Sequence, residues 1–160
     1  MPDDPRILHP GHAPTPFTAD EIRTGCPVGR TIRLVVNDGG NRYLRMIRFL
    51  AVDETAANQE SSAVTTDGVP LGDPALGRTT WLEFQEHASF PTVATTIERE
   101  ALNSSLGRLE CLVYTVDNGE SVSRFWFATT RPGMPVKVET RVGGEISYEM
   151  AMTGDEISQL

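Results

Sequence analysis

The chain contains 160 residues, of which 14 are Lys or Arg and 22 are Asp or Glu, so its formal net charge is −8. A chain of this length is expected to form one soluble domain that buries about 68–70% of the surface its unfolded form exposes. The excess of acidic residues repels phosphate groups, which argues against binding to nucleic acids and to anionic membrane surfaces. The sequence has no apolar run of the roughly 18 residues that a membrane span requires.

The N-terminus and the cysteines bear on the cellular compartment. The chain begins Met-Pro-Asp-Asp-Pro-Arg, with no apolar segment of a secretory signal peptide behind it, so we expect a cytoplasmic protein. Two cysteines are too few for a disulfide framework. Cys111 alternates in step with Leu109 and Val113, which predicts a buried thiol. Cys26 lies in a Gly-Cys-Pro turn that we expect to be more exposed, and it would need an activating partner to act as a nucleophile.

Residues 1–17 carry five prolines and show no helical or strand periodicity. They are therefore interpreted as a Pro-rich tail that is extended or disordered, or that lies along the domain. His9 and His12 flank a Pro-Gly turn at a spacing that would allow two contacts to a metal, but no third ligand follows nearby. We expect these histidines to be solvated, and we predict no metal site.

Two capping boxes predict two short helices. In the first, Thr18 and Glu21 satisfy each other's backbone N–H groups, and the helix ends by Gly25. The second is formed by Thr80 and Glu83 and opens a helix that reaches about Ala88. Helices this short are not stable alone, so both are expected to pack on the body of the domain.

The remaining runs predict about eight strands separated by turn residues. The strongest hairpin signal is Asn118-Gly119, because both central residues of such a turn must tolerate positive φ. This pair joins a strand that follows Gly107 to an aromatic strand from Arg124 to Ala128. Residues 72–77 are expected to form a loop. Further strands are expected near residues 29–36, 60–66, 92–99, 136–141 and 146–152.

The segment Arg42–Val52 fits two structures. As a helix it would gather Tyr43, Met46, Ile47 and Leu50 on one face, whereas as a strand it would alternate its apolar residues between two faces. We choose the strand because two parts of the chain share an order of a Gly-Arg strand, a glycine turn and an arginine-aromatic strand. The first begins at Gly29-Arg30 and turns at Asp38-Gly39, and the second begins at Gly107-Arg108 and turns at Asn118-Gly119.

These elements define the expected architecture. The fold class is mostly β with minor α: a single curved antiparallel sheet, or a half-barrel or barrel, of about eight strands with two short helices. It forms one domain over residues 18–152. Residues 153–160 are polar and are expected to be a frayed C-terminus.

The aromatic content suggests a function for the curved sheet. Three successive aromatic residues on one strand make both of its faces apolar, which is more than two short helices cover. We therefore expect a non-enzymatic module whose concave face binds an apolar small molecule or lipid-like group, with no cofactor. The residues expected to line this site are Trp81, Phe125, Trp126, Phe127, Tyr148 and Met150.

A sequence resemblance points in the same direction. The runs Ser105–Tyr114, Phe125–Ala128 and Pro132–Glu139 resemble a pattern found in uncharacterised bacterial β-rich proteins. Their sheets are similar to those of the periplasmic lipoprotein carriers of the LolA and LppX type. The resemblance covers about 35 residues and implies a curved antiparallel sheet with an apolar concavity, with no catalytic residue to carry over.

Two other functions stay open. An exposed strand edge or aromatic patch would make the chain a protein-interaction module, for example a homodimer. A small cyclase-like or hydrolytic barrel enzyme would have to use His87, Glu83 or Arg124, with His87 as a general base beside Glu83. The sequence contains no nucleophile elbow, phosphate loop, zinc-finger spacing or dinucleotide fingerprint, which favours the binding module.

Overall fold

The computed structural model describes residues 4–157. Within this range the chain forms nine strands, two short α-helices and one 3₁₀ turn. In chain order these elements are α1 (Ala19–Gly25), β1 (Arg30–Asp38), β2 (Asn41–Val52), β3 (Ala56–Thr65), β4 (Ala75–Thr80), α2 (Trp81–Glu86), η1 (Thr92–Ala94), β5 (Thr95–Ser104), β6 (Gly107–Asp117), β7 (Ser121–Ala128), β8 (Lys137–Val142) and β9 (Glu145–Ile157).

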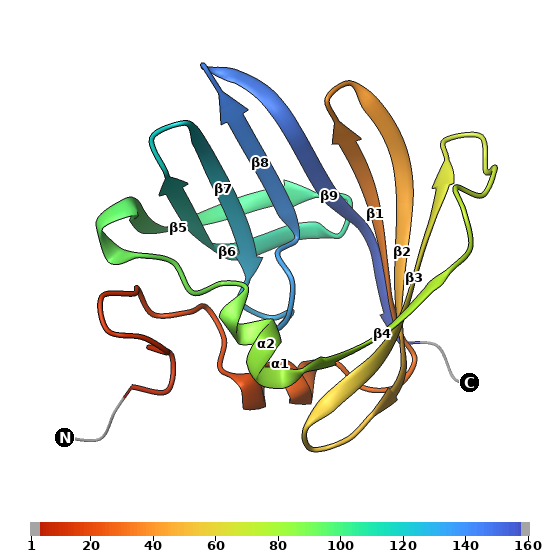
Figure 1. Ribbon diagram of the computed structural model, residues 1–160, viewed down its shortest axis with the longest axis horizontal. Coiled ribbons are helices and arrows are strands. Elements are labelled where there is room, and N and C mark those ends of the chain that lie inside the picture. Colours follow the sequence, from red (N-terminus) through yellow and green to blue (C-terminus); the bar gives the residue numbers. More distant parts are fainter. Residues whose placement is uncertain (1–3, 158–160) are drawn as a thin grey trace.

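The strands form a single sheet in the order β4-β3-β2-β1-β9-β8-β7-β6-β5, and every neighbouring pair is antiparallel. The sheet consists of two meanders, β1–β4 and β5–β9, which meet where β1 pairs with β9. Figure 1 shows that the sheet is curved and that α1 and α2 lie in the lower part of the view. The predicted mostly-β, curved antiparallel fold is confirmed. The sheet is open, because β4 and β5 lie at its two edges.

Two boundaries differ from the prediction. Residues 75–77, expected in a loop, belong to β4, which pairs with β3 at the edge of the sheet. β4 is the strand that was not predicted, and it raises the number of strands from about eight to nine. Residues 153–157, expected to be frayed, continue β9 because they pair with the beginning of β1; residues 158–160 lie outside the described range. The ambiguous segment Arg42–Val52 is a strand within β2, as predicted.

The glycine turns follow two different geometries. Gly39 and Gly40 both have positive φ, 58° and 89°, and close the β1–β2 hairpin with two residues. At Asn118-Gly119 only the glycine has positive φ. Asn118 instead accepts hydrogen bonds from the N–H groups of Glu120 and Ser121 through its side-chain oxygen. The predicted hairpin is therefore present, but with a longer turn held by an asparagine side chain.

Both predicted capping boxes are formed. Thr18 accepts from the N–H of Glu21 at 3.1 Å, and Glu21 accepts from the N–H of Thr18 at 3.0 Å. The corresponding distances at Thr80 and Glu83 are 3.0 and 3.1 Å. These side chains satisfy orphan N–H groups at the start of α1 and α2, which fixes where each helix begins.

The N-terminal segment lies along the domain from residue 4 onward. The buried side chain of Gln85 in α2 donates to the carbonyl oxygen of Pro5 at 2.8 Å and to the hydroxyl of Thr15 at 3.0 Å, and it accepts from the N–H of Ala19 at 2.9 Å. The hydroxyl of Tyr114 donates to the carbonyl oxygen of Pro14 at 2.6 Å. Of the two arrangements considered for the tail, the described part adopts the docked one.

A buried ion pair joins the start of β1 to the end of β9. The Arg30 guanidinium donates to both carboxylate oxygens of Asp155 at 2.9 Å, and Arg131 donates to the same carboxylate at 2.9 Å. Only 3% of the Arg30 side chain and 7% of the Asp155 side chain are exposed. Arg30 also donates to the carbonyl oxygens of Gly25 and Pro132. The pair therefore fastens the two meanders, the end of α1 and the segment after β7 at one point.

The charges around Asp155 set its titration. Burial alone would raise the pKa of this carboxyl, but the hydrogen bonds and charges of Arg30 and Arg131 outweigh burial and lower it below the ordinary value. The ionised pair consequently stabilises the fold above the pKa of an unfolded aspartate, about 3.9, and this stabilisation is lost as the pH falls through the lower folded-state value.

We predict that Asp155→Asn lowers the free energy of unfolding by about 3–5 kcal/mol, because it leaves the Arg30 charge buried without its partner. Urea denaturation monitored by circular dichroism measures this change. The matched control is Glu156→Gln, which removes an exposed partner of Arg33 and is expected to cost less than about 1 kcal/mol. Equal effects of the two substitutions would contradict the role assigned to the buried pair.

Candidate functional site

A cavity of about 390 Å³ lies between the sheet, α1, α2 and the segment before β8. Its volume is within the range of about 300–1,000 Å³ that is typical of small-molecule sites. The residues around it are mainly apolar, with a few polar groups among them. They are Ile22, Cys26, Arg30, Ile32, Arg45, Ile47, Phe49, Gln59, Thr79, Phe84, His87, Ala88, Phe125, Phe127, Gly133, Met134 and Pro135.

Strand alternation makes the wall of the cavity apolar. Ile32 in β1 pairs with Ile47 in β2, so their side chains lie beside each other on one face of the sheet. Phe49 follows two residues after Ile47 and shares that face, because successive side chains on a strand point to opposite sides. Phe125 and Phe127 contribute from β7 by the same rule. The cavity thus collects apolar side chains from both meanders.

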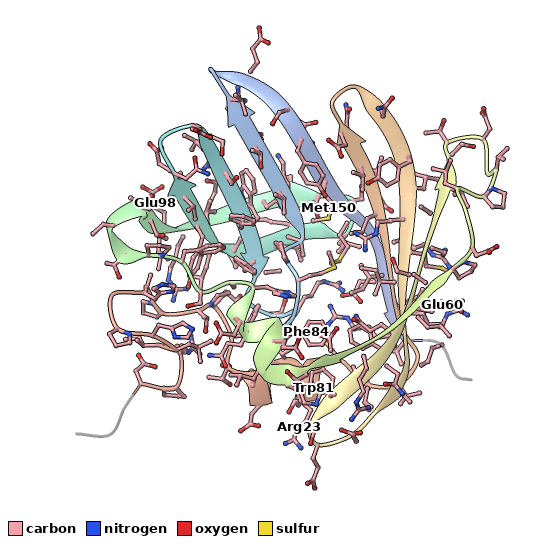
Figure 2. All side chains as sticks on the ribbon, viewed as in Figure 1. Arg23, Glu60, Trp81, Phe84, Glu98 and Met150 are labelled. Carbon is pink, nitrogen blue, oxygen red and sulfur yellow. The ribbon has the colours of Figure 1, made fainter. Side chains whose placement is uncertain are left out.

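The helix α2 forms the opposite wall. The ring of Phe84 lies 6.2 Å from that of Phe49 and 5.7 Å from that of Trp81. His87, the residue after the helix, meets Phe84 edge-on at 6.5 Å. Figure 2 shows Phe84 and Trp81 together at α2, whereas Met150 lies farther along the sheet. The helix therefore covers only part of the apolar face, and the cavity lies beside it.

The structure divides the six predicted lining residues. Phe125 and Phe127 line the cavity. Trp81 is buried behind Phe84, and its indole N–H donates to the carbonyl oxygen of Asp53 at 2.8 Å. Met150 is a core residue on β9, which lies between β1 and β8. Tyr148 lies two residues earlier on β9 and pairs with Asp38, the last residue of β1. These three are not among the residues that line the cavity.

Trp126 has a different environment from its two neighbours. It points to the other face of β7, because it stands between Phe125 and Phe127. There its ring is flanked by two cations, the guanidinium of Arg124 and the ammonium of Lys137, each 4.7 Å from the ring centroid. The indole N–H is 3.4 Å from a carboxylate oxygen of Glu100. The cation–π contacts account for Trp126 without a ligand.

The three catalytic candidates do not converge. His87 lies in the cavity wall. Glu83 is engaged in the capping box of α2, where hydrogen bonds from Thr80 lower its pKa. Arg124 lies over Trp126 on the opposite face of the sheet and is 3.4 Å from Glu100. A general base at His87 would therefore have neither Glu83 as a free partner nor Arg124 nearby.

The tail histidines contact side chains near α2. His9 lies 2.8 Å from a carboxylate oxygen of Glu86, and His12 lies 2.8 Å from the hydroxyl of Ser89. Within residues 4–157, no group of three or more His, Cys, Asp and Glu side chains is placed to hold a metal ion. None of the helices in this range is long and apolar enough to cross a membrane.

The two thiols are both buried. Cys111 has the environment predicted from its alternation with Leu109 and Val113. Cys26, expected to be more exposed, is only 1% exposed, because it packs beneath Arg30, whose guanidinium lies 3.0 Å from its sulfur. Burial raises the pKa of the Cys26 thiol although the Arg30 charge opposes this. The reactive thiolate is therefore disfavoured.

Several cavity residues were not predicted from the sequence. Arg45 and Ile47 lie in the strand whose type was ambiguous, and Gln59 and Thr79 lie on β3 and β4. The strand alternation of residues 42–52 already separates Arg45 and Ile47 from Leu44 and Met46. It does not show which of the two faces is concave.

No protein-family model matches the chain, and no curated protein matches it in sequence. Its fold is similar to that of solved structures at low identity. A chain of the Pseudomonas aeruginosa MucA/MucB complex has a TM-score of 0.60 and 10% identity over 81% of this chain and 52% of that one. A structure of MucB has a TM-score of 0.58 and 8% identity over 86% and 56%, respectively.

A protein with a YmcC-like fold from Bacteroides fragilis has a TM-score of 0.51 and 8% identity, over 82% of this chain and 97% of that one. The chain thus spans about half the length of the MucB structures and nearly all of the YmcC-like one. At such identities the likeness shows the fold alone. It agrees with the predicted curved antiparallel sheet, and no match to a family model supports the sequence resemblance itself.

Proposed function

We propose that the chain is a non-enzymatic binding module that holds an apolar small molecule or lipid-like group in the cavity beside α2. The observation that carries this proposal is the cavity itself, about 390 Å³ in volume and walled by isoleucine and phenylalanine side chains. Burying an alkyl chain there would remove about 0.8 kcal/mol of unfavourable hydration for each CH₂ group. The few polar groups at the wall are the kind that orient a ligand.

The curvature of the sheet supports the same function. The concave face of a strongly bent sheet has to be filled, and α1 and α2 contain only seven and six residues. They lie in the lower part of the view in Figure 1. A bound apolar molecule would complete the packing that these helices leave open.

The expected test is binding of the neutral fluorescent probe N-phenyl-1-naphthylamine. We predict that the purified chain binds the probe and that Ile47→Trp weakens binding at least about tenfold, because the indole fills the cavity, a loss of about 1.4 kcal/mol. The matched control is Leu44→Trp, on the same strand but on the opposite face of the sheet, which should bind as the parent does. No binding by the parent chain, or equal weakening in both variants, would contradict the proposal.

A second candidate function is protein interaction. Three apolar residues near the β4 edge are exposed, Val69 at 58%, Leu71 at 51% and Leu76 at 74%. Exposed apolar groups on an edge strand favour pairing with another chain. Among the similar structures, MucB has been solved in complex with MucA.

Self-association through this edge predicts a concentration-dependent dimer that Leu76→Lys disrupts, because a charged side chain on an edge strand opposes pairing. Size-exclusion chromatography with light scattering measures the mass. A strict monomer at high concentration would remove the homodimer as a function.

The cytoplasmic location expected from the sequence stays a prediction.

A further inference from the structure

We infer that the ligand of the cavity is a single-chain carboxylate, such as a medium-chain fatty acid, whose head group pairs with Arg45. This inference rests on the proposed function and specifies the chemical class of the ligand. Its basis is the position of a guanidinium that makes no ion pair within residues 4–157, in the wall of a mainly apolar cavity.

Arg45 lies on the cavity face of β2. It is two residues before Ile47 on the same strand, and both residues line the cavity. Its side chain is half-buried and donates one hydrogen bond, to the hydroxyl of Ser61 on β3 at 3.2 Å. A guanidinium has five N–H donors. Most of the hydrogen-bonding capacity of Arg45 is therefore left for a ligand or for water.

The charges at the cavity wall are unbalanced. Three of the lining residues can carry a positive charge, Arg30, Arg45 and His87, and none carries a carboxylate. Arg30 is neutralised by its bidentate pair with Asp155. Arg45 makes no ion pair within residues 4–157. In the low dielectric beside an apolar wall, such a cation attracts an anion more strongly than it would in water.

Two tyrosines lie on the same side of the sheet as Arg45. Tyr43 precedes it by two residues on β2, and Tyr148 on β9 pairs with Asp38 at the end of β1. Burial and the nearby Tyr43 raise the pKa of Tyr148, against the opposing effect of Arg45, with Asp38 a further cause of the rise. Tyr148 thus stays a neutral hydroxyl that can donate a hydrogen bond. Asp38 lies at the turn end of β1 and pairs with Asn41, four residues before Arg45 on β2.

The size and charge of the molecule narrow the ligand class. The net charge of −8 repels anions at long range, so recognition of an anion has to be local. One guanidinium matches one carboxylate in a bidentate geometry. A cavity of about 390 Å³ is near the lower end of ligand sites. It therefore suits one alkyl chain and not the two chains of a diacyl lipid.

The test compares decanoate with 1-decanol, which share a chain length and differ in head-group charge. Each is used at pH 8 to displace N-phenyl-1-naphthylamine from the purified chain. We expect the parent to bind decanoate at least about tenfold more tightly than decanol, because a charge-assisted pair is stronger than a neutral hydrogen bond. In Arg45→Met the decanoate affinity should fall to that of decanol, with the decanol affinity kept. Arg45→Lys should retain part of the preference.

The control variant is Arg42→Met, which removes an exposed cation from the other face of the same strand and should leave the preference unchanged. Binding of decanol with no preference for decanoate, or a preference that survives in Arg45→Met, would overturn this inference and leave the proposed function standing. Failure of both compounds and of the probe itself to bind would overturn both.

Discussion

One buried ion pair fastens the two halves of the sheet at one end of the β1–β9 ladder. β1 and β9 come from opposite ends of the chain, and the pair of Arg30 with Asp155 lies where their paired ends meet. The same guanidinium also donates hydrogen bonds to the carbonyl oxygens of Gly25, at the end of α1, and of Pro132. Gly133, Met134 and Pro135 follow directly and form part of the cavity wall. The charged cluster thus positions part of the cavity wall. Arg30 itself lines the cavity, but its charge is neutralised by Asp155.

The cavity results from two features of the sheet, the alternation of side chains along each strand and the bend of the sheet as a whole. Alternation places one set of apolar side chains on the concave face of each strand, and the bend of the sheet brings the sets from β1, β2 and β7 toward one another. α2 fills part of the space with Phe84, and Gln85 on its other side ties it to the N-terminal segment. The sheet side of the wall belongs to the hydrogen-bonded ladder of strands, and the helix side is held by the hydrogen bonds of Gln85. Arg45 adds to this wall a guanidinium that makes no ion pair within residues 4–157.

Local features of this fold were predictable from the sequence because their causes lie within a few residues. The capping boxes at Thr18 and Thr80 and the alternation that buries Cys111 are of this kind. β4 was missed because its glycine and the preceding Asp-Pro lower its strand propensity, and only pairing with β3 decides its structure. The burial of Asp155 was missed because its partner, Arg30, is 125 residues away in sequence. For the site, alternation separates Phe125 and Phe127 from Trp126, but only the tertiary structure shows which face has the cavity.

The most direct test of the central claim is an NMR titration that follows the isoleucine methyl groups while decanoate is added. Ile22, Ile32 and Ile47 line the cavity, whereas Ile97, Ile146 and Ile157 are exposed elsewhere. An apolar binding site between the sheet and α2 predicts saturable shifts and ligand-to-methyl nuclear Overhauser contacts at the first three isoleucines and none at the others. Shifts confined to the exposed set, or no saturable shift at all, would contradict an apolar binding site between the sheet and α2.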